Sequence, residues 1–202
     1  MILFRRTRVA RPASWRWNLA KTHLHTLYFW AVFFVVIPWL IVTVEPSTIF
    51  VHFRWNSEPL RILAVALFVL FGILGLGTGT IMAIAGQGTP LPIDTARRLV
   101  VIGPYRYVRN PMAIAGIVQG MAVGLFLGSP GVVLYAAVGA PIWSIFVKPA
   151  EEADLLARFG EAYAHYRRSV RCWIPRWPGY EAPEAFKTSE TTSSLTPSTS
   201  ST

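Results

Sequence analysis

Charged residues are scarce in this sequence. Of its 202 residues, 14% are charged and 53% are hydrophobic. Soluble domains carry about 25% charged residues, so the composition excludes an ordinary soluble protein and indicates a membrane protein. Charge is absent altogether from three long stretches, which are residues 27–44, 62–86 and 110–147.

Cysteine is limited to Cys172, which excludes an intrachain disulfide and is interpreted as an ordinary packed thiol. The four histidines show no spacing typical of metal ligands, so we expect no metal site. The net charge of +9 does not call for a nucleic-acid partner, because cations beside anionic lipid headgroups explain it.

The charge-free stretches predict an all-α membrane protein with about four transmembrane helices, at about residues 25–44, 61–86, 112–128 and 131–147. A membrane strand would alternate polar and apolar residues, which these runs do not. The last stretch is too long for one helix and is predicted to divide at Gly128-Ser129-Pro130-Gly131, residues typical of a tight turn. Alternatively, one helix of this hairpin is re-entrant or interfacial, because each is short.

The distribution of Lys and Arg predicts the orientation, since cations near the ends of spans stay in the cytoplasm. Of 19 Lys and Arg, only Arg54, between the first and second predicted spans, and Arg61, the first residue of the second, lie where these two spans are joined. The others precede the first span, separate the second from the third, or follow the fourth. We therefore predict a multi-pass integral membrane protein with both termini and the middle loop in the cytoplasm, whose first span is an anchor and not a removable signal.

Three regions follow from this pattern. They are a basic cytoplasmic arm (residues 1–24), a membrane domain (25–177) and a Ser/Thr-rich tail expected to be disordered (178–202). Within the second span, a series of glycines favours close helix packing over a cofactor contact. The series comprises Gly72, Gly75, Gly77 and Gly79.

The loop between the second and third spans is polar and rich in turn formers. Prolines and glycines exclude a continuous helix over residues 87–111, while Arg106 and Arg109 offer donors to a carboxylate or phosphate. Pro111 suits the first turn of the third span, with Asn110 as its cap.

After the fourth span, Pro149 is predicted to open a cytoplasmic helix over about residues 149–169. Glu151 and Glu152 lie in its first turn and suit an ammonium group or ribose hydroxyls. A ligand with both an amino group and a carboxylate, such as S-adenosylmethionine, would match this pair together with the loop. One face of the helix is expected to pack, because apolar residues recur there at near-helical spacing. They are Leu155, Phe159, Tyr163 and Tyr166.

An ordered set of motifs runs through the second half of the chain. It consists of Gly103-Pro-Tyr-Arg-Tyr-Val-Arg-Asn-Pro, the helical hairpin, Glu151-Glu152, Phe159-Gly160, Tyr163, Tyr166 and Trp173-Ile-Pro-Arg. Together these motifs resemble the isoprenylcysteine carboxyl methyltransferase and phospholipid N-methyltransferase superfamily. The resemblance extends over residues 60 to 177.

The resemblance implies that S-adenosylmethionine is bound above the membrane. It also implies methyl transfer to a lipid or a lipidated small-molecule or peptide acceptor that enters from the lipid. Candidate catalytic residues are Arg109 and Glu152, the latter as base for an ammonium acceptor. Lys148 is the candidate contact for an acceptor carboxylate. Implied cofactor contacts are Leu99, Val100, Tyr105, Asn110, Pro111, Met112, Glu151 and Glu152.

The chain departs from the carboxyl methyltransferases at two places. Asn110 stands where they usually carry His, and an amide cannot titrate. The arginine expected near an acceptor carboxylate is missing, with Val147 and Lys148 as the nearest residues. The sequence therefore leaves the acceptor open among carboxylate, amine and thiol.

Two alternatives stay open. Membrane reductases of the steroid 5α-reductase type, which use NADPH on sterols or lipids, share a similar Arg-x-x-Pro loop. They usually carry an acid after the Gly of the following helix, whereas Ile117 follows Gly116 here. The other alternative is a non-enzymatic membrane protein whose arginines serve only as headgroup anchors.

Overall fold

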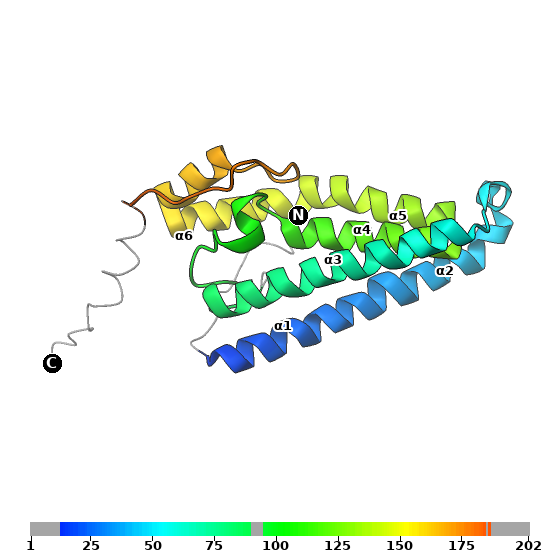
Figure 1. Cartoon of the computed structure of the whole chain (residues 1–202), viewed down its shortest axis with the longest axis horizontal. Helices are drawn as coiled ribbons and strands as arrows, with labels where there is room; N and C mark the ends of the chain where they lie inside the picture. The colour runs from blue at the N-terminus through cyan, green and yellow to red at the C-terminus, as the bar shows by residue number, and fades with distance from the viewer. Residues whose placement is uncertain (1–12, 90–94, 185, 187–202) are drawn as a thin grey trace.

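The chain folds into a bundle of long helices that lie side by side (Figure 1). A computed structural model describes residues 13–89, 95–184 and 186. These residues contain no β-strand, which confirms the predicted all-α fold. The helical segments are α1 (Trp15–Trp30), the π-helix η1 (Ala31–Val36), α2 (Ile37–Val44), the 3-10 helices η2 (Glu45–Ser47) and η3 (Ile49–Phe53), α3 (Glu58–Ala85), the 3-10 helix η4 (Gly103–Arg106), α4 (Pro111–Leu127), α5 (Pro130–Ile142), the π-helix η5 (Trp143–Val147) and α6 (Lys148–Ser169).

Three helical runs in the described part of the chain are long and apolar enough to cross a membrane, and α4 is a shorter apolar helix. The three runs are Trp15–Ser47, Glu58–Ala85 and Pro130–Ser169. Large apolar side chains such as Ile73 and Leu70 point outward from them and stay exposed, as a surface that faces lipid requires. This arrangement is that of a multi-pass membrane protein, as predicted.

A tight turn joins α4 to α5, as predicted, and marks what we call the hairpin end of the bundle. Gly128 ends α4 with a φ of +62°, and the Ser129 side chain caps α5 by accepting a hydrogen bond from the Val132 N–H at 3.1 Å. Glu45, at the end of the first helix, fastens this turn. Its Oε1 accepts hydrogen bonds from Ser129 Oγ at 2.9 Å and from the Gly131 N–H at 3.0 Å.

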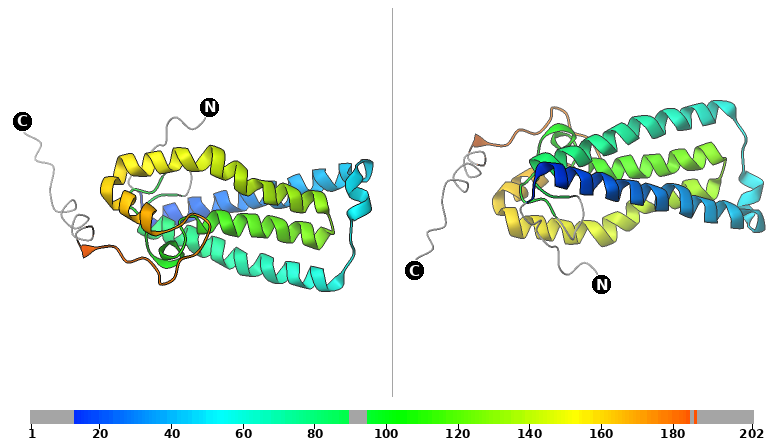
Figure 2. Two further views of the ribbon diagram at one scale, coloured as in Figure 1. Left: turned by 90° about the horizontal axis from the view of Figure 1, so that it is seen from above. Right: turned by 90° about the horizontal axis from the view of Figure 1, so that it is seen from below.

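The sequence predicted that a separate helix starts at Pro149. This prediction is wrong, because α5, η5 and α6 form one continuous helix (Figure 2). Pro141 and Pro149 lie on either side of η5. Proline lacks an N–H and its ring displaces the preceding turn. The helix widens here and does not break, since the Lys148 N–H bonds to the Trp143 carbonyl five residues back. The kink comes later, at Gly160, where φ is 50° and ψ is −129°.

The predicted basic arm, residues 1–24, is partly helical. Residues 1–12 lie outside the described residues, but α1 already begins at Trp15. Ser14 starts it there, because its hydroxyl accepts a hydrogen bond from the Trp17 N–H at 3.3 Å.

The predicted boundary of a disordered tail at residue 178 is wrong. Residues 187–202 lie outside the described residues, but Tyr180 is buried against Tyr166, with ring centroids 5.2 Å apart. The Tyr180 N–H also donates to the Arg106 carbonyl at 2.8 Å. The Ser/Thr content of the tail did not indicate that Tyr180 is buried.

Three of the four predicted glycines of α3, Gly72, Gly75 and Gly79, let neighbouring helices approach closely, whereas a Cβ on Gly77 would meet nothing within 4 Å. A Cβ on Gly79 would lie 3.2 Å from Thr22 Cγ2 and 3.6 Å from Met112 Cε. A Cβ on Gly75 would lie 3.4 Å from Ala115 Cβ. These positions fix the separation of three helices at the end of the bundle opposite the hairpin.

Replacement of Gly128 by Ala should destabilise the hairpin. A side chain in the left-handed region costs about 1–3 kcal/mol, and the new Cβ would lie only 1.9 Å from the Trp55 carbonyl oxygen. Gly77→Ala is the matched control, because Gly77 is a helical residue and a Cβ added to it would meet nothing within 4 Å. This variant should keep the stability or raise it by up to about 1 kcal/mol. Thermal unfolding in detergent measures both, and equal midpoints would contradict the prediction.

Candidate functional site

A cavity of about 990 Å³ lies at the loop end of the bundle, where the loop that joins α3 to α4 meets α6. Its walls come from α1, η1, α4, α5, η5, α6 and this loop, with Met82 of α3 and Cys172 after α6. Toward the hairpin end the walls are apolar, with Phe29 and Phe33 on one side and Leu134 and Val138 on the other. Toward the loop end they carry most of the charged side chains. The cavity therefore suits a molecule with an apolar part and a polar head.

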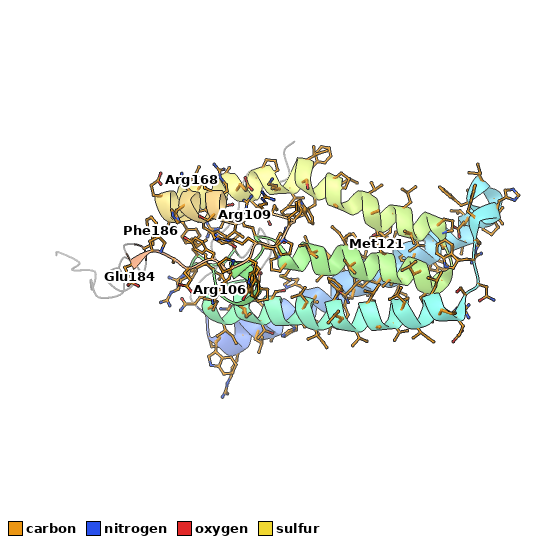
Figure 3. All side chains as sticks on the ribbon, turned by 45° about the horizontal axis from the view of Figure 1, so that its top comes forward. Arg106, Arg109, Met121, Arg168, Glu184 and Phe186 are labelled. Carbon is orange, nitrogen blue, oxygen red and sulfur yellow. The ribbon has the colours of Figure 1, made fainter. Side chains whose placement is uncertain are left out.

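Arg109 joins the loop to α6 and to the segment that follows it. Its Nη1 donates to Glu152 Oε1 at 2.5 Å, and its Nε donates to the Val170 carbonyl at 2.8 Å. The two paired side chains are only 13% and 19% exposed. Figure 3 shows Arg109 where the loop passes beneath α6. Burial alone would lower the pKa of Arg109, but the hydrogen bond and charge of Glu152 raise it above its ordinary value.

Glu152 is surrounded by cations. Besides Arg109, Lys148 Nζ lies 3.8 Å from Oε1 and Arg167 Nη1 lies 3.6 Å from Oε2. Arg109 and Lys148 are the two cations that the sequence suggested for catalysis and for an acceptor carboxylate. Both already have an anionic partner within the protein.

Glu151 differs sharply from its neighbour. It lines the cavity and is partly buried, and no described residue forms a hydrogen bond or ion pair with its carboxylate. Burial raises the pKa of Glu151 to about 7, and the charges of Glu152 and Asp154 add to this effect. An unpaired carboxylate in a cavity suits a cationic or hydroxyl-bearing ligand.

The structure brings all but one of the predicted site residues to this cavity. Pro111 is the exception, because it is fully buried in the first turn of α4. Asn110 caps α4, as predicted, since its Oδ1 accepts a hydrogen bond from the Ala113 N–H at 3.1 Å. None of the described glycines of α3 is among the lining residues, which fits their packing role. The predicted residues that line the cavity are Leu99, Val100, Tyr105, Arg109, Asn110, Met112, Lys148, Glu151 and Glu152.

Buried tyrosines support the loop from the α6 side. Tyr166 donates its hydroxyl to the Tyr105 carbonyl at 2.7 Å, and Tyr163 and Tyr166 form a core with Val170 and Tyr180. Leu155 and Phe159 pack against it, which confirms the predicted packing face. Burial, followed by the charge of Glu152, raises the pKa of Tyr163 to about 12, so its phenol stays neutral.

A segment that the sequence analysis missed fastens the loop from outside. We call residues 170–184 the C-terminal strap. The Arg176 N–H donates to the Tyr107 carbonyl at 2.9 Å, and Arg106 Nε donates to the Tyr180 carbonyl at 2.9 Å. Motif Trp173-Ile-Pro-Arg was the available signal, but its spacing does not say what it contacts.

The α3-side part of the loop is held by Arg158 of α6. Arg158 Nε donates to Asp154 Oδ2 at 2.8 Å, and its Nη1 donates to the Ala96 carbonyl at 2.5 Å. The two arginines, Arg109 and Arg158, therefore tether opposite ends of the loop to the same helix. Neither spacing nor composition indicated the role of Arg158.

The first helix also reaches the cavity, which the sequence analysis did not predict. Thr22, His25 and Thr26 line it. They had been assigned to the basic arm and the first span. The available signal was a run of polar residues placed just before the apolar stretch.

Cys172 is buried, lines the cavity and forms no disulfide. Burial raises the pKa of its thiol above the ordinary value, so it stays protonated. Within the described ranges, no group of three or more His, Cys, Asp or Glu could hold a metal ion.

The sequence of the chain is similar to those of known methyltransferases. The family model for phospholipid methyltransferase matches residues 59–162, just over half of the chain. A methanethiol S-methyltransferase of Mycobacterium tuberculosis is 36% identical over 74 residues, which are 37% of this chain and 29% of that protein. A protein-S-isoprenylcysteine O-methyltransferase of Schizosaccharomyces pombe is 31% identical over 117 residues, 53% of this chain and 48% of that protein. The chain thus spans less than half the length of either relative.

Arg109→Lys should loosen the loop and the C-terminal strap. Lysine keeps the charge, but its single amine cannot reach both Glu152 and the Val170 carbonyl. Hydrogen bonds to charged groups contribute about 1.5–3 kcal/mol, so backbone hydrogen exchange in both segments should rise about tenfold or more.

Arg168→Lys is the control, because Arg168 lies on the outer side of α6 in an exposed pair with Glu161 (Figure 3). It should leave exchange unchanged. Mass spectrometry of deuterium uptake measures the difference, and equal uptake in the two variants would show that Arg109 does not hold the loop.

Proposed function

The chain belongs to the phospholipid methyltransferase family, and from this premise we propose that it transfers the methyl group of S-adenosylmethionine to an acceptor that enters the cavity from the membrane. One observation carries the proposal, namely the unpaired carboxylate of Glu151 in a cavity that is polar at one end and apolar at the other. A cationic cofactor and an apolar acceptor are the two reactants of such a reaction.

The residues present fit the cofactor. Glu151 would take its ammonium group or ribose hydroxyls, and loop residues Leu99, Val100, Tyr105 and Met112 would enclose it, as the sequence resemblance implies. When bound, the cofactor supplies an activated methyl group on a sulfonium. The protein then needs mainly to position the two reactants and exclude water.

Arg109 and Glu152 support this proposal as a positioning pair. The sequence analysis suggested Glu152 as a base, but its carboxylate is already paired with three cations, Arg109, Lys148 and Arg167. Its contacts favour a role in holding the loop above the cavity. Lys148 likewise pairs with Glu152, which weakens its case as the contact for an acceptor carboxylate.

The acceptor would enter sideways. Phe33, Leu134 and Ile142 line the cavity yet remain 42%, 50% and 51% exposed, so their side chains also face the outside of the bundle. This opening lies between η1 on one side and α5 on the other. A lipid or lipidated acceptor could keep its tail in the bilayer while its head reaches the loop end.

Two further features belong to the proposal. The loop end, with both termini, would face the cytoplasm, because nearly all cations of the chain lie on that side of the spans. Nicotinamide-dependent reduction and a purely structural role remain the alternatives. Relatives named as methyltransferases favour methyl transfer over both.

The direct experiment is to incubate the purified protein with methyl-labelled S-adenosylmethionine and total membrane lipid. Label should enter the lipid fraction, and its lability to base distinguishes an ester from an amine or thioether. Binding of NADPH in preference to S-adenosylmethionine would overturn the proposal in favour of reduction.

Glu151→Gln should weaken cofactor binding and abolish its dependence on pH. A carboxylate bonded to a cation contributes about 1.5–3 kcal/mol more than no bond, so the dissociation constant should rise about tenfold or more at pH 8. The pKa of Glu151 is about 7. Wild-type affinity should therefore fall by up to about tenfold per pH unit below pH 7, as the carboxylate is protonated, and level off above it.

Glu161→Gln is the matched control, since Glu161 lies on the same helix but is exposed. Calorimetry in detergent at pH 6, 7 and 8 measures all three proteins. A variant at position 151 that binds as tightly as the wild type at pH 8 would remove the main support for the proposal.

Val138→Trp should obstruct the apolar half of the cavity. An indole there would displace about two methylenes of an acceptor chain, worth about 0.8 kcal/mol each, so kcat/KM for a long-chain acceptor should fall about tenfold while cofactor affinity stays the same. Ile73→Trp, on the outer face of α3, is the control and should change neither. Equal activity of both variants would place the acceptor elsewhere.

A further inference from the structure

The polar face of α1 is the part of the cavity that the methyltransferase match leaves unassigned. Thr22, His25 and Thr26 lie on it and line the cavity, while the family match begins only at residue 59. Thr22 has a buried hydroxyl with no hydrogen-bond partner among the described residues. Buried hydroxyls are nearly always bonded, so an unpaired hydroxyl beside the cavity is unusual.

His25 presents an unprotonated nitrogen in its neutral form. Its Nδ1 lies 2.7 Å from the Lys21 carbonyl oxygen. A carbonyl only accepts hydrogen bonds, so we assign the proton to Nδ1, which leaves the lone pair on Nε2. No described residue bonds to Nε2, and the ring borders the cavity. Imidazole is the commonest general base in enzymes.

His25 lies at the height along the bundle where methyl transfer would take place. Thr22 lies beside Met112, since both approach the same position on Gly79. His25 is one helical turn further from the loop, and Phe29 and Phe33 follow it along the apolar wall. It therefore lies between the end of the cavity that would hold the cofactor and the part that would hold an acceptor tail.

The α4 wall of the cavity leaves room at the height of His25. Gly116 is one turn beyond Met112 on α4 and lines the cavity, and a Cβ added to it would meet nothing within 4 Å. Gly116 therefore leaves the α4 wall of the cavity open for an acceptor.

The charges around this position select among acceptors. Three of the cations that line the cavity are paired, Arg109 and Lys148 with Glu152, and Arg158 with Asp154, while Arg98 is exposed in the loop. The α1 wall offers only uncharged donors and acceptors. A carboxylate would lack a counter-charge here. An ammonium would approach a sulfonium of the same sign, with no unpaired carboxylate left once Glu151 holds the cofactor. A thiol is neutral, costs little to desolvate and must lose a proton to react.

Resting on the proposed function, we propose that α1 forms the acceptor subsite, and that His25 is the catalytic base for a lipophilic thiol. The thiol proton passes to His25 Nε2 while the sulfur forms a new bond to the methyl carbon. The bond between the methyl carbon and the sulfonium sulfur breaks, and its electron pair stays on that sulfur as a neutral thioether.

The test uses the full-length protein in detergent with methyl-labelled S-adenosylmethionine and dodecanethiol. His25→Gln keeps a polar side chain but cannot take up the proton, so kcat should fall about 100-fold with unchanged cofactor affinity. His23→Gln is the matched control. His23 lies on the same helix, is bonded to Thr80 at 3.2 Å and does not line the cavity, so activity should stay within about twofold of wild type.

A second acceptor separates catalysis from structure. An alkyl-substituted nitrothiophenol is already a thiolate at neutral pH and needs no base, so the His25→Gln variant should methylate it nearly as fast as the wild type does. Equal loss with both thiols, or no loss with either, would overturn the role of His25.

The two proposals fail in different ways. A wild type that binds the cofactor and methylates lipid but not dodecanethiol would overturn the thiol subsite and leave the proposed function standing. A wild type that neither binds the cofactor nor labels any acceptor would overturn both.

Discussion

The shape of the site depends on the contacts of Arg109. Its guanidinium bonds to Glu152 of α6 and to the Val170 carbonyl, and its own N–H bonds to Arg171 in the C-terminal strap. The loop, the start of α6 and the strap that follows α6 meet at this residue. A loop full of prolines and glycines has no internal ladder of hydrogen bonds, so external tethers of this kind decide its shape.

The same pairing gives adjacent carboxylates opposite properties. Glu152 is surrounded by cations, whereas Glu151 faces the cavity unpaired, and burial raises its pKa to about 7. Glu152 holds the loop in place through Arg109, and Glu151 remains available to bind a ligand. Because Arg109 and Lys148 are occupied by Glu152, the remaining recognition in the cavity is mostly neutral, and α1 supplies much of it.

Much of the fold was predictable. Long charge-free runs predicted helices because lipid offers the backbone no partner, and Gly128 to Gly131 and Asn110-Pro111 predicted a turn and a helix start from local chemistry. The continuity of the helix through Pro149 was not predictable, because whether a helix breaks or widens at proline depends on neighbouring turns and packing. The burial of Tyr180 in a polar tail was not predictable for a related reason, since its partners lie far away in sequence.

The sequence by itself determined the fold class, the hairpin, and the short list of residues that meet at one cavity. These follow from hydrophobicity, turn chemistry and motif order, which are local properties. Only the tertiary structure decided which carboxylate is paired, which cations are occupied, and that Thr22 and His25 line the cavity. Charge partners and cavity walls are set by contacts between helices, and spacing along one chain does not encode those distances.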